Sequence, residues 1–471
     1  EDGDADFHGL HASAADKLAR RRGNFTLRSP VGGLIASHLR LGNDMTTNVD
    51  AVADRFAKVR ARTERLAAPL SAEDQVVQSM PDTSPTKWHR AHTTWFFAEF
   101  ALHADGTSGR VWDRPEYRFL YNSYYEAVGA RHPRPQRGLV TRPSCAEVAD
   151  YRNHVDKEMF ELIAGGLDTA IAAVVELGTH HEEQHQELLL MDIKHVLSMN
   201  PAVGPAYADR PHQPAVDPGP SSWVDFDGGL ANIGVDADAD GFSFDSEGPS
   251  HQVLLYPYAL ADRLVTAGEW IDFISDGGYQ RPELWKSDGW YRAQSEGWTA
   301  PEYWRPDPDQ PDAWWIHTLT GLRSVDPHEP VVHVSHYEAD AFATWSSARL
   351  PTEFEWEAAA ADYAVAGNVL DEQRDDFTFH PGAAGPATGG LRQLFGDCWE
   401  GTPSAYQPYP GFSIADGAIG EYNGKFMSGQ QVLRGGCVFT PPGHTRSTYR
   451  NFFHPHTRWH ASGVRLATDC Q

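Results

Sequence analysis

The stretch that decides the fold of this chain is HHEEQHQELLLMDIKH, residues 180–195. Residues 181–185 within it read HEEQH and match the H-E-x-x-H pattern of zinc metalloproteases, in which two histidines bind the metal. Residues i and i+4 lie on one face of a helix, so His181 and His185 can chelate one metal ion. The stretch therefore predicts a helix that carries a metal site, and the remaining sequence must show which kind.

A zinc metalloprotease needs a third ligand downstream of this motif. The position six residues after His185 is Met191, and no glutamate occurs between Glu187 and Glu247. Both common versions of the protease motif therefore lack their third ligand. A plainer alternative is that the two histidines only decorate a solvated helix face.

A second histidine group weakens that plain alternative. The segment TKWHRAHTTWFFAEFAL, residues 86–102, holds His89 and His92 beside several Trp and Phe residues. An aromatic surface of this kind is typical of a core, so His92 can point inward and supply a third ligand. Helical bundles commonly build metal sites from side chains on facing helices.

The sequence around both histidine groups predicts a four-helix bundle over residues 46–200. Apolar residues recur at three- and four-residue steps, which is the helical period. Ser144 is placed to cap the third helix. The four predicted helices cover residues 48–67, 86–102, 145–166 and 168–198. The long aromatic and arginine-rich crossover between the second and third helices, residues 114–144, indicates a functional segment.

The rest of the chain divides into three further parts. Residues 1–45 show no sustained period and are expected to form a flexible extension, and residues 201–222 form a proline-rich linker. Residues 223–471 contain short segments with many Gly, Trp and Pro turns. They predict an α+β domain with helices at 338–348 and 351–362, and short strands and long loops elsewhere. The fold class is therefore α+β multidomain.

Composition excludes several classes of function. The chain has 471 residues, with 39 Lys and Arg against 65 Asp and Glu, so the formal net charge is -26. This charge disfavours nucleic acid and anionic membranes as partners. No apolar run approaches the roughly 18 residues of a membrane helix, and the start of the chain lacks the pattern of a signal peptide. Four cysteines without C-x-x-C spacing indicate a reducing, cytoplasmic location.

The two histidine segments, SPTKWHRAHTTWFF at 84–97 and HHEEQHQE at 180–187, resemble the DinB-like bundle of the EgtB-type sulfoxide synthases of ergothioneine biosynthesis. The second half resembles the formylglycine-generating-enzyme fold, a C-type-lectin-like scaffold that this family fuses to the bundle. The motifs of the second half are FDGGLANIGVD, RLVTAGEWIDFISDGGY, ARLPTEFEWEAAA, LFGDCWEGTPSAYQPYPGF, VLRGGCVFTP and YRNFFHPHTRWHASGVRLA. The resemblance covers residues 46–471.

The resemblance implies one non-haem Fe(II) bound by His92, His181 and His185, whereas His89 matches a position that is not a ligand. It also implies O2-dependent C–S bond formation between hercynine (Nα-trimethylhistidine) and a thiol, which gives a sulfoxide. Three neutral imidazoles leave iron positions open for substrate and O2. Gln184 matches a residue near the substrate imidazole.

Candidate substrate-binding residues come from the second half and from the crossover. A trimethylammonium group donates no hydrogen bond and needs an aromatic surround, which Phe452 and Phe453 offer, with Asn451 for the polar end of the substrate. Both rings could instead pack the core of the second domain. Arg131 and Arg134 are candidates for a substrate carboxylate, with a solvated basic loop as the alternative.

The sequence departs from the branch of the family that uses γ-glutamylcysteine. An Asp and an Arg of the thiol site in that branch align here with Phe453 and Thr457, and its catalytic tyrosine aligns at about Ile419. The chain instead resembles the branch that accepts free cysteine. Tyr124 and Tyr125 of the crossover are then the candidate catalytic residues, because a phenol near the iron can deliver a proton.

Two other functions remain open from the sequence. One is 5-histidylcysteine sulfoxide synthase of the ovothiol pathway, which commonly carries a C-terminal methyltransferase domain that does not follow Gln471 here. The other is a non-catalytic, lectin-like binding protein. Formylglycine generation itself is not expected, because that chemistry needs two cysteines soon after the RGG motif and only Cys437 is present.

Overall fold

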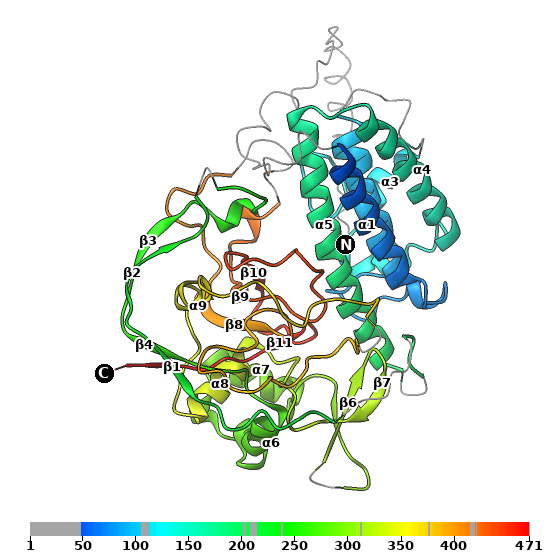
Figure 1. The fold of residues 1–471 in the computed structure, drawn as a ribbon. Helices are drawn as coiled ribbons and strands as arrows, with labels where there is room; N and C mark the ends of the chain where they lie inside the picture. The colour runs from blue at the N-terminus through cyan, green and yellow to red at the C-terminus, as the bar shows by residue number, and fades with distance from the viewer. Residues whose placement is uncertain are drawn as a thin grey trace, which may run out of the picture.

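The computed structural model describes residues 49–470 apart from 105–111, 113, 201–203, 208–213, 237–238, 311–312, 375–376, 415–419 and 421. The expected flexible extension, residues 1–45, lies outside the described part. Figure 1 shows a helical half, which contains the N-terminal elements, beside a half built of small sheets and short helices. This arrangement confirms the predicted α+β multidomain fold class.

The helical half is a bundle of four main helices, as predicted. They are α1 (Val49–Ala67), α2 (Thr86–Phe97), α4 (Cys145–Ala164) and α5 (Thr169–Ser198). The central helix α2 packs against both α4 and α5, and α1 packs against α5. Ser144 caps α4 by accepting a hydrogen bond from the Glu147 amide, as expected, and Glu147 bonds back to the Ser144 amide to complete a capping box.

The crossover between α2 and α4 is only partly helical. A π-helical turn, η4 (Ala98–Leu102), extends α2, and two short elements follow, α3 (Pro115–Leu120) and η6 (Arg134–Leu139). Tyr121, Asn122 and Tyr125 between them are fully buried. These three side chains therefore anchor this part of the crossover in the bundle, whereas residues 126–136 are exposed or half-buried.

The described residues of the second half form four small sheets. One sheet has the order β10 (Asn451–Phe453), β9 (Gln431–Arg434), β8 (Trp399–Ala405) and β11 (Ser462–Gly463). Another has the order β1 (Trp223–Phe226), β4 (Tyr258–Ala261) and β12 (Ala467–Asp469). The remaining two join β2 (Gly229–Ile233) to β3 (His251–Leu255), and β5 (Trp304–Pro306) to β6 (Trp314–Thr318) and β7 (Gly321–Ser324). The β8–β11 pair is parallel and the other pairs are antiparallel.

Four helices accompany these sheets, and the sequence predicted two of them. Helices α8 (His336–Trp345) and α9 (Glu353–Ala360) were expected, whereas α6 (Ala267–Ser275) and α7 (Ser287–Glu296) fall in a region assigned to strands and loops. That assignment was wrong. The available signal was Thr266, which forms a capping box with the glutamate three residues later.

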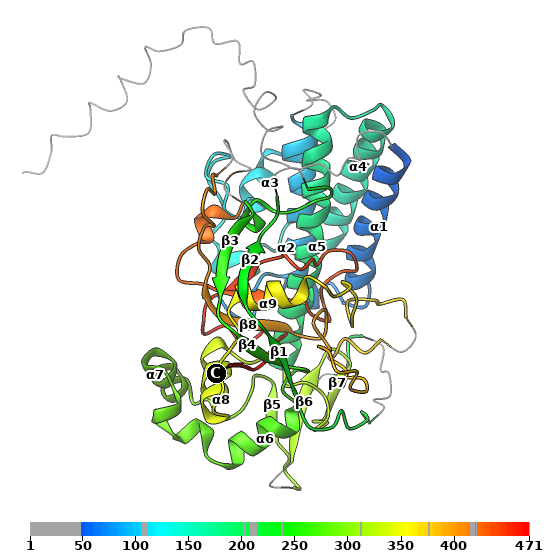
Figure 2. The same cartoon turned by 60° about the vertical axis from the view of Figure 1, so that its left-hand side comes forward.

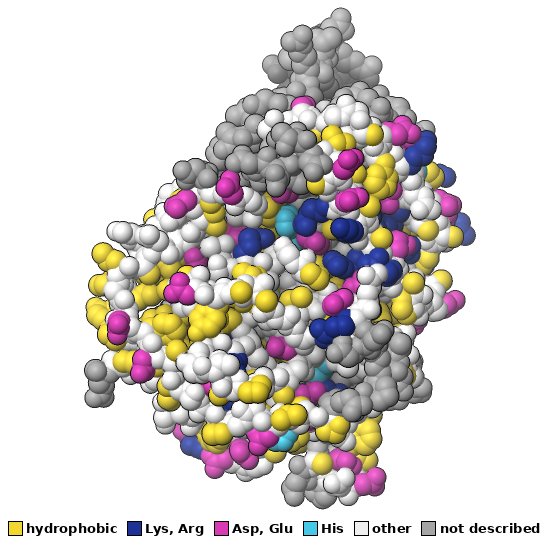
Figure 3. Space-filling model, viewed as in Figure 1, with side chains coloured by type: hydrophobic (Ala, Val, Ile, Leu, Met, Phe, Trp, Pro, Cys, Tyr) yellow, Lys and Arg dark blue, Asp and Glu magenta, His cyan; other side chains and the backbone are white. Residues whose placement is uncertain are grey.

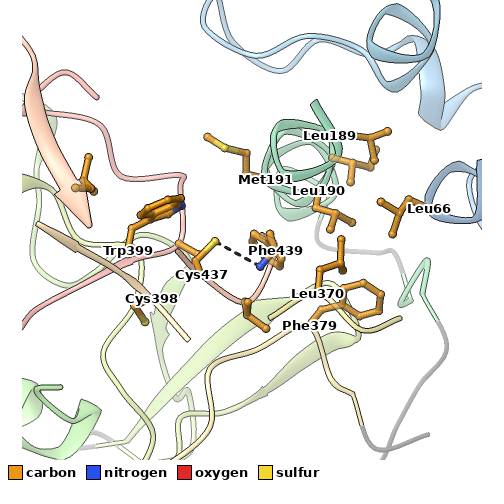
Figure 4. Close-up of a cluster of buried hydrophobic side chains, with 14 of the residues drawn as sticks. Leu66, Leu189, Leu190, Met191, Leu370, Phe379, Cys398, Trp399, Cys437 and Phe439 are labelled. Atoms are coloured by element: carbon orange, nitrogen blue, oxygen red, sulfur yellow. Dashed lines mark hydrogen bonds between the residues drawn. The ribbon is translucent and has the colours of Figure 1, made fainter. Parts of the chain in front are cut away.

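One hydrophobic core runs through both halves of the molecule. Figure 4 shows Leu189, Leu190 and Met191 of α5 beside side chains of the second half, including Trp399 and Phe439. Because α5 meets the bundle on one side and the sheets on the other, most of its residues are buried. Figures 1 and 2 both place α5 at the boundary between the two halves. Side chains on α5 are therefore held rigidly where the halves meet.

Exposed apolar side chains lie together on the strands far from the bundle. Leu230 of β2 and Leu254 of β3 face each other in the register, and Tyr256 follows β3; all three are exposed. Figure 3 shows hydrophobic side chains on this side of the molecule, where Figure 1 places β2 and β3. Among the described residues, no helix combines the length and apolar character that crossing a bilayer would require.

Candidate active site

Helices α2 and α5 bring His92, His181 and His185 together. Each histidine offers a ring nitrogen, and these three nitrogens lie within 4.8 Å of one another. The Nε2 atoms of His92 and His181 are 3.2 Å apart, and the ring centroids of His181 and His185 are 4.6 Å apart. The three imidazoles that the sequence singled out thus converge on one point inside the bundle.

The hydrogen bonds of His92 define which of its nitrogens is free. Its Nδ1 lies 2.6 Å from the backbone oxygen of Tyr121, which can only accept, so Nδ1 carries the hydrogen. Trp88 stacks on the ring at a centroid distance of 4.5 Å. The Nε2 lone pair of His92 therefore points at His181, the orientation that a metal-ligating histidine needs.

The cluster fits a divalent metal ion. Burial lowers the pKa of His92 well below its usual value and lowers the pKa of His181 to about 3, so both rings stay neutral at physiological pH. Two ring nitrogens that are ligands at about 2.1 Å and at right angles lie about 3.0 Å apart. The 3.2 Å separation of His92 and His181 agrees with that spacing.

His185 is oriented by a second histidine and a carboxylate. Nε2 of His89 lies 3.1 Å from Oδ2 of Asp192, and Nδ1 of His89 lies 2.8 Å from Nδ1 of His185. Burial lowers the pKa of His89, so its ring is neutral and donates only to the carboxylate. Nδ1 of His89 must then accept a hydrogen bond from His185, which leaves Nε2 of His185 as a free lone pair. Both ring nitrogens of His89 are thus committed to Asp192 and His185, the arrangement of a residue that orients a neighbouring metal ligand.

The glutamate of the H-E-x-x-H pattern is not available as a catalytic base. Glu182 accepts hydrogen bonds from Arg60 at 2.7 Å, Arg152 at 2.9 Å and the Thr63 hydroxyl at 2.6 Å. Burial raises its pKa, but the two guanidinium groups and these hydrogen bonds more than offset this and lower the pKa to about 2. The residue that a metalloprotease would use therefore stabilises the interior of the bundle.

A cavity of about 320 Å³ adjoins His181 and His185 at the junction of the two halves. Its walls come from α5, the crossover and the loops around β10, so neither half forms it alone. Six other candidate residues line it: Tyr124, Arg134, Gln184, Asn451, Phe452 and Phe453. The three-histidine cluster thus opens onto a space large enough for small substrates.

The two phenylalanines face the cavity and also pack within the second half. Phe452 stacks on Tyr406 at a centroid distance of 4.2 Å, and Phe453 stacks on His460 at 4.3 Å. The packing that the sequence left open as an alternative is therefore present, while both rings also lie at the cavity wall, where a substrate contact stays a prediction.

Two other sequence candidates do not reach the cavity wall. Arg131 forms an ion pair with Glu126 and does not line the cavity. Tyr125 is fully buried, and its hydroxyl lies behind the cavity wall, 3.5 Å from the hydroxyl of Tyr124. Ile419, where the tyrosine of the other branch aligns, lies outside the described residues.

Two further tyrosines line the cavity: Tyr449, which the sequence interpretation missed, and Tyr422, which it offered only as the next phenol to test if neither crossover tyrosine donates the proton. Nε2 of Gln184 donates to the Tyr449 hydroxyl at 2.7 Å, and the Tyr422 hydroxyl donates to Oε1 of Gln184. The Tyr422 ring also meets His181 edge-on at a centroid distance of 5.6 Å. A sequence signal for Tyr449 existed as well, because residues two apart in an extended segment share a face and Asn451 was already a candidate.

Helix α5 carries a second polar cluster on another face, which we call the interface cluster: His180, Glu183, His444 and Arg55. The two histidine Nδ1 atoms are 3.1 Å apart and lie 3.3 and 3.2 Å from Oε2 of Glu183. The Arg55 guanidinium lies 2.8 Å from the same oxygen. His444 comes from the second half, so this cluster joins the two halves, and sequence spacing gave no sign of it.

Comparison with known proteins agrees with this architecture. The model of the DinB superfamily matches residues 55–196, and the model of the sulfatase-modifying factor enzyme 1-like domain matches residues 212–470. The chain is 33% identical over 445 residues to the hercynine oxygenase of Mycolicibacterium smegmatis, which covers 89% of this chain and 99% of that protein. It is 32% identical over 444 residues to the hercynine oxygenase of Mycobacterium tuberculosis, with 90% and 100% covered.

A shorter match is to a formylglycine-generating enzyme. The formylglycine-generating enzyme of Thermomonospora curvata is 34% identical over 151 residues, which are 28% of this chain and 46% of that protein. A DinB-type bundle whose histidine cluster faces a sulfatase-modifying-factor-like domain across a cavity defines a class of oxygenase enzymes. Within that class, the chain belongs to the hercynine oxygenase family.

Proposed function

We propose that this chain is a non-haem iron sulfoxide synthase that joins hercynine to the thiol of cysteine and gives hercynylcysteine sulfoxide. The observation that carries the proposal is the cluster of His92, His181 and His185, whose neutral rings converge beside a cavity. Membership of the hercynine oxygenase family supports the choice of the imidazole substrate.

The reaction balances with O2 as the only oxidant. One imidazole C–H bond and one S–H bond break, a C–S bond and an S–O bond form, and the second oxygen atom leaves as water. Iron bound by the three histidines supplies the redox chemistry that O2 activation needs, which zinc cannot supply. Three protein ligands leave positions open for substrates, as in oxygenase sites built from two histidines and one carboxylate.

The cavity residues have separate roles in binding hercynine. Gln184 lies on the helix that carries His181 and His185, and its amide can reach the substrate imidazole. Phe452 and the neighbouring aromatic rings provide the surface that a trimethylammonium group requires. Asn451 supplies a polar group at the same wall.

The thiol site favours cysteine over γ-glutamylcysteine. Phe453 and Thr457 line the cavity where the other branch has an Asp and an Arg, so the longer thiol lacks partners for its additional charged groups. A charged group left without a hydrogen-bond partner costs about 1–3 kcal/mol, or roughly tenfold or more in kcat/KM. Arg134 at the cavity rim is the candidate partner of the cysteine carboxylate.

Tyr124 is the phenol that we propose as proton donor during sulfoxide formation. It lines the cavity, and it is half-buried, whereas Tyr125 lies behind it. The contact between the two hydroxyls lets Tyr125 hold the Tyr124 ring in place. General-acid catalysis requires the donor to reach the reacting atoms, and this favours Tyr124.

The test uses the iron(II)-loaded chain with oxygen and pairs of substrates. We expect oxygen uptake with hercynine and cysteine, and a product whose mass equals both substrates plus one oxygen minus two hydrogens. A preference for histidine over hercynine would instead indicate 5-histidylcysteine sulfoxide synthase. No uptake with either imidazole would favour a binding protein. A cytoplasmic location fits the four unpaired cysteines, Cys145, Cys398, Cys437 and Cys470.

A further inference from the structure

Two tyrosines of the second half hold the amide of Gln184, which projects from the bundle. The Tyr422 hydroxyl donates to Oε1 of Gln184, and Nε2 of Gln184 donates to the Tyr449 hydroxyl at 2.7 Å. All three residues line the cavity. The amide is therefore fixed in one orientation by contacts that cross the junction of the two halves.

The direction of these hydrogen bonds leaves one donor uncommitted. The hydrogen of Tyr422 is used by Gln184, and one amide hydrogen of Gln184 is used by the oxygen of Tyr449. Since the Tyr449 oxygen accepts, its own hydrogen is free to turn toward the cavity. Within the described residues, no other polar atom lies at hydrogen-bonding distance from the Tyr449 hydroxyl, although only 4% of the residue is exposed. A buried hydroxyl that donates to nothing is costly, so its position indicates a ligand.

We propose that the Tyr449 hydroxyl donates a hydrogen bond to the carboxylate of the imidazole substrate. This inference rests on the proposed function, in which one imidazole nitrogen faces the metal. The other ring nitrogen then carries a hydrogen, so the carboxylate is the acceptor that the substrate has left. Oε1 of Gln184 keeps a lone pair for the ring N–H, because Tyr422 occupies only one. Gln184 thus recognises the ring and Tyr449 recognises the carboxylate.

The two tyrosines should differ when their hydroxyls are removed. Tyr422→Phe releases Gln184, whose amide contacts the ring, so binding of any imidazole should weaken. Tyr449→Phe removes the donor to the carboxylate, so only ligands that carry a carboxylate should be affected. Tyr303 is a matched control, because its buried hydroxyl has no partner among the described residues and it lies outside the cavity.

The experiment measures the dissociation constants of hercynine and of imidazole by calorimetry on the iron(II)-loaded chain without oxygen. Thermal unfolding of each variant confirms that it is folded. We expect Tyr449→Phe to raise the dissociation constant of hercynine by about tenfold or more, the range for loss of a hydrogen bond to a charged group. The dissociation constant of imidazole should change less than twofold. Tyr422→Phe should weaken both ligands by a similar factor, and Tyr303→Phe should change neither.

Two results would overturn the inference. One is hercynine binding within twofold of the unmodified chain in Tyr449→Phe, and the other is an equal loss for imidazole and hercynine in that variant, which would mean that Tyr449 acts only through Gln184. A failure of the proposed function looks different, because the unmodified chain would then neither bind hercynine nor form the sulfoxide. Binding and turnover in the unmodified chain with no effect of Tyr449→Phe would refute the carboxylate contact alone.

Discussion

Helix α5 carries two histidine clusters built from similar residues, and they differ in charge. The cavity cluster, His92, His181 and His185, consists of neutral imidazoles beside an open space. The interface cluster has two histidines and Glu183 at mutual distances of 3.1 to 3.3 Å, which also resembles a metal site. Adjacent residues of a helix point about 100° apart, so neighbours in sequence enter different surroundings.

The interface cluster already contains its cation. Burial raises the pKa of Glu183, but hydrogen bonds from His180 and His444 and the charge of Arg55 hold that pKa well below its usual value. The Arg55 guanidinium contacts the carboxylate oxygen that a metal would use. A divalent ion there would meet a positive charge in contact with the one carboxylate, whereas among the described residues no guanidinium or ammonium group is hydrogen-bonded to the ring nitrogens of the cavity cluster. The comparison teaches that charge compensation, more than ligand type, distinguishes a metal site from a structural one.

The largest expected difference between the clusters is in turnover. His185→Ala should lower the rate of sulfoxide formation by more than about 1,000-fold, because it removes a metal ligand next to the substrate. His444→Ala, the matched change in the interface cluster, should keep the rate within about tenfold. Product formation by mass spectrometry on iron-loaded variants measures both. Equal losses of turnover in the two variants would contradict the assignment of the metal to the cavity cluster alone.

The next effect concerns the outcome of the reaction at the cavity cluster. Tyr124→Phe should lower C–S bond formation by about 100-fold, within the range for loss of a general acid, while iron and substrate binding persist. Tyr125→Phe should have a smaller effect, because its hydroxyl does not line the cavity. The ratio of sulfoxide to plain oxidised cysteine reports the change. Normal sulfoxide rates in both variants would place the proton donor elsewhere.

A smaller effect is expected from the residues that orient His185. Asp192→Asn exchanges the carboxylate that holds His89 for an amide, and His89→Ala removes the support altogether. Loss of such supporting groups typically weakens metal binding 10–100-fold. Competition with a chelator measures the affinity for Fe(II) in each variant. Unchanged affinity in His89→Ala would show that His185 needs no orienting partner.

Both clusters should make the folded chain less stable as the pH falls. Burial lowers the pKa of His180 and of His181 to about 3, below the unfolded value near 6.5. Below pH 6.5 the unfolded chain therefore binds protons that the folded chain does not, and stability falls as pH falls. Without metal, each of these histidines should lower the free energy of unfolding by about 2 kcal/mol as the pH falls from 6.5 to 5. Urea unfolding at both values tests this, and a free energy of unfolding that rises toward pH 5 would contradict it.

The helices and site residues that could be predicted from the sequence are those fixed by short-range spacing along the chain. The four bundle helices follow from apolar periodicity, and the pairing of His181 with His185 follows from a four-residue step. The position of His92 could be predicted as well, because bundle helices with aromatic faces pack on each other. Residues whose neighbours are fixed by docking of the second half could not be foreseen.

Those residues share a dependence on contacts across the junction. His444 reaches Glu183 from more than 250 positions away, and Tyr422 reaches Gln184 over a similar separation. Arg131 and Arg134 are equivalent in sequence, yet only Arg134 lines the cavity, because the chain turns between them. No local pattern encodes such choices. The missed helices α6 and α7 are short, and their capping signals are local: the Thr266 capping box for α6 and the left-handed Gly297 at the end of α7.

The number of iron atoms per chain tests the central claim most directly. The unmodified chain, His92→Ala and His444→Ala are each saturated with Fe(II) without oxygen, desalted and assayed for iron, with circular dichroism to confirm folding. The account predicts one iron in the unmodified chain, one in His444→Ala and less than about one tenth in His92→Ala. Retention of one iron by His92→Ala, or two irons in the unmodified chain falling to one in His444→Ala, would contradict it.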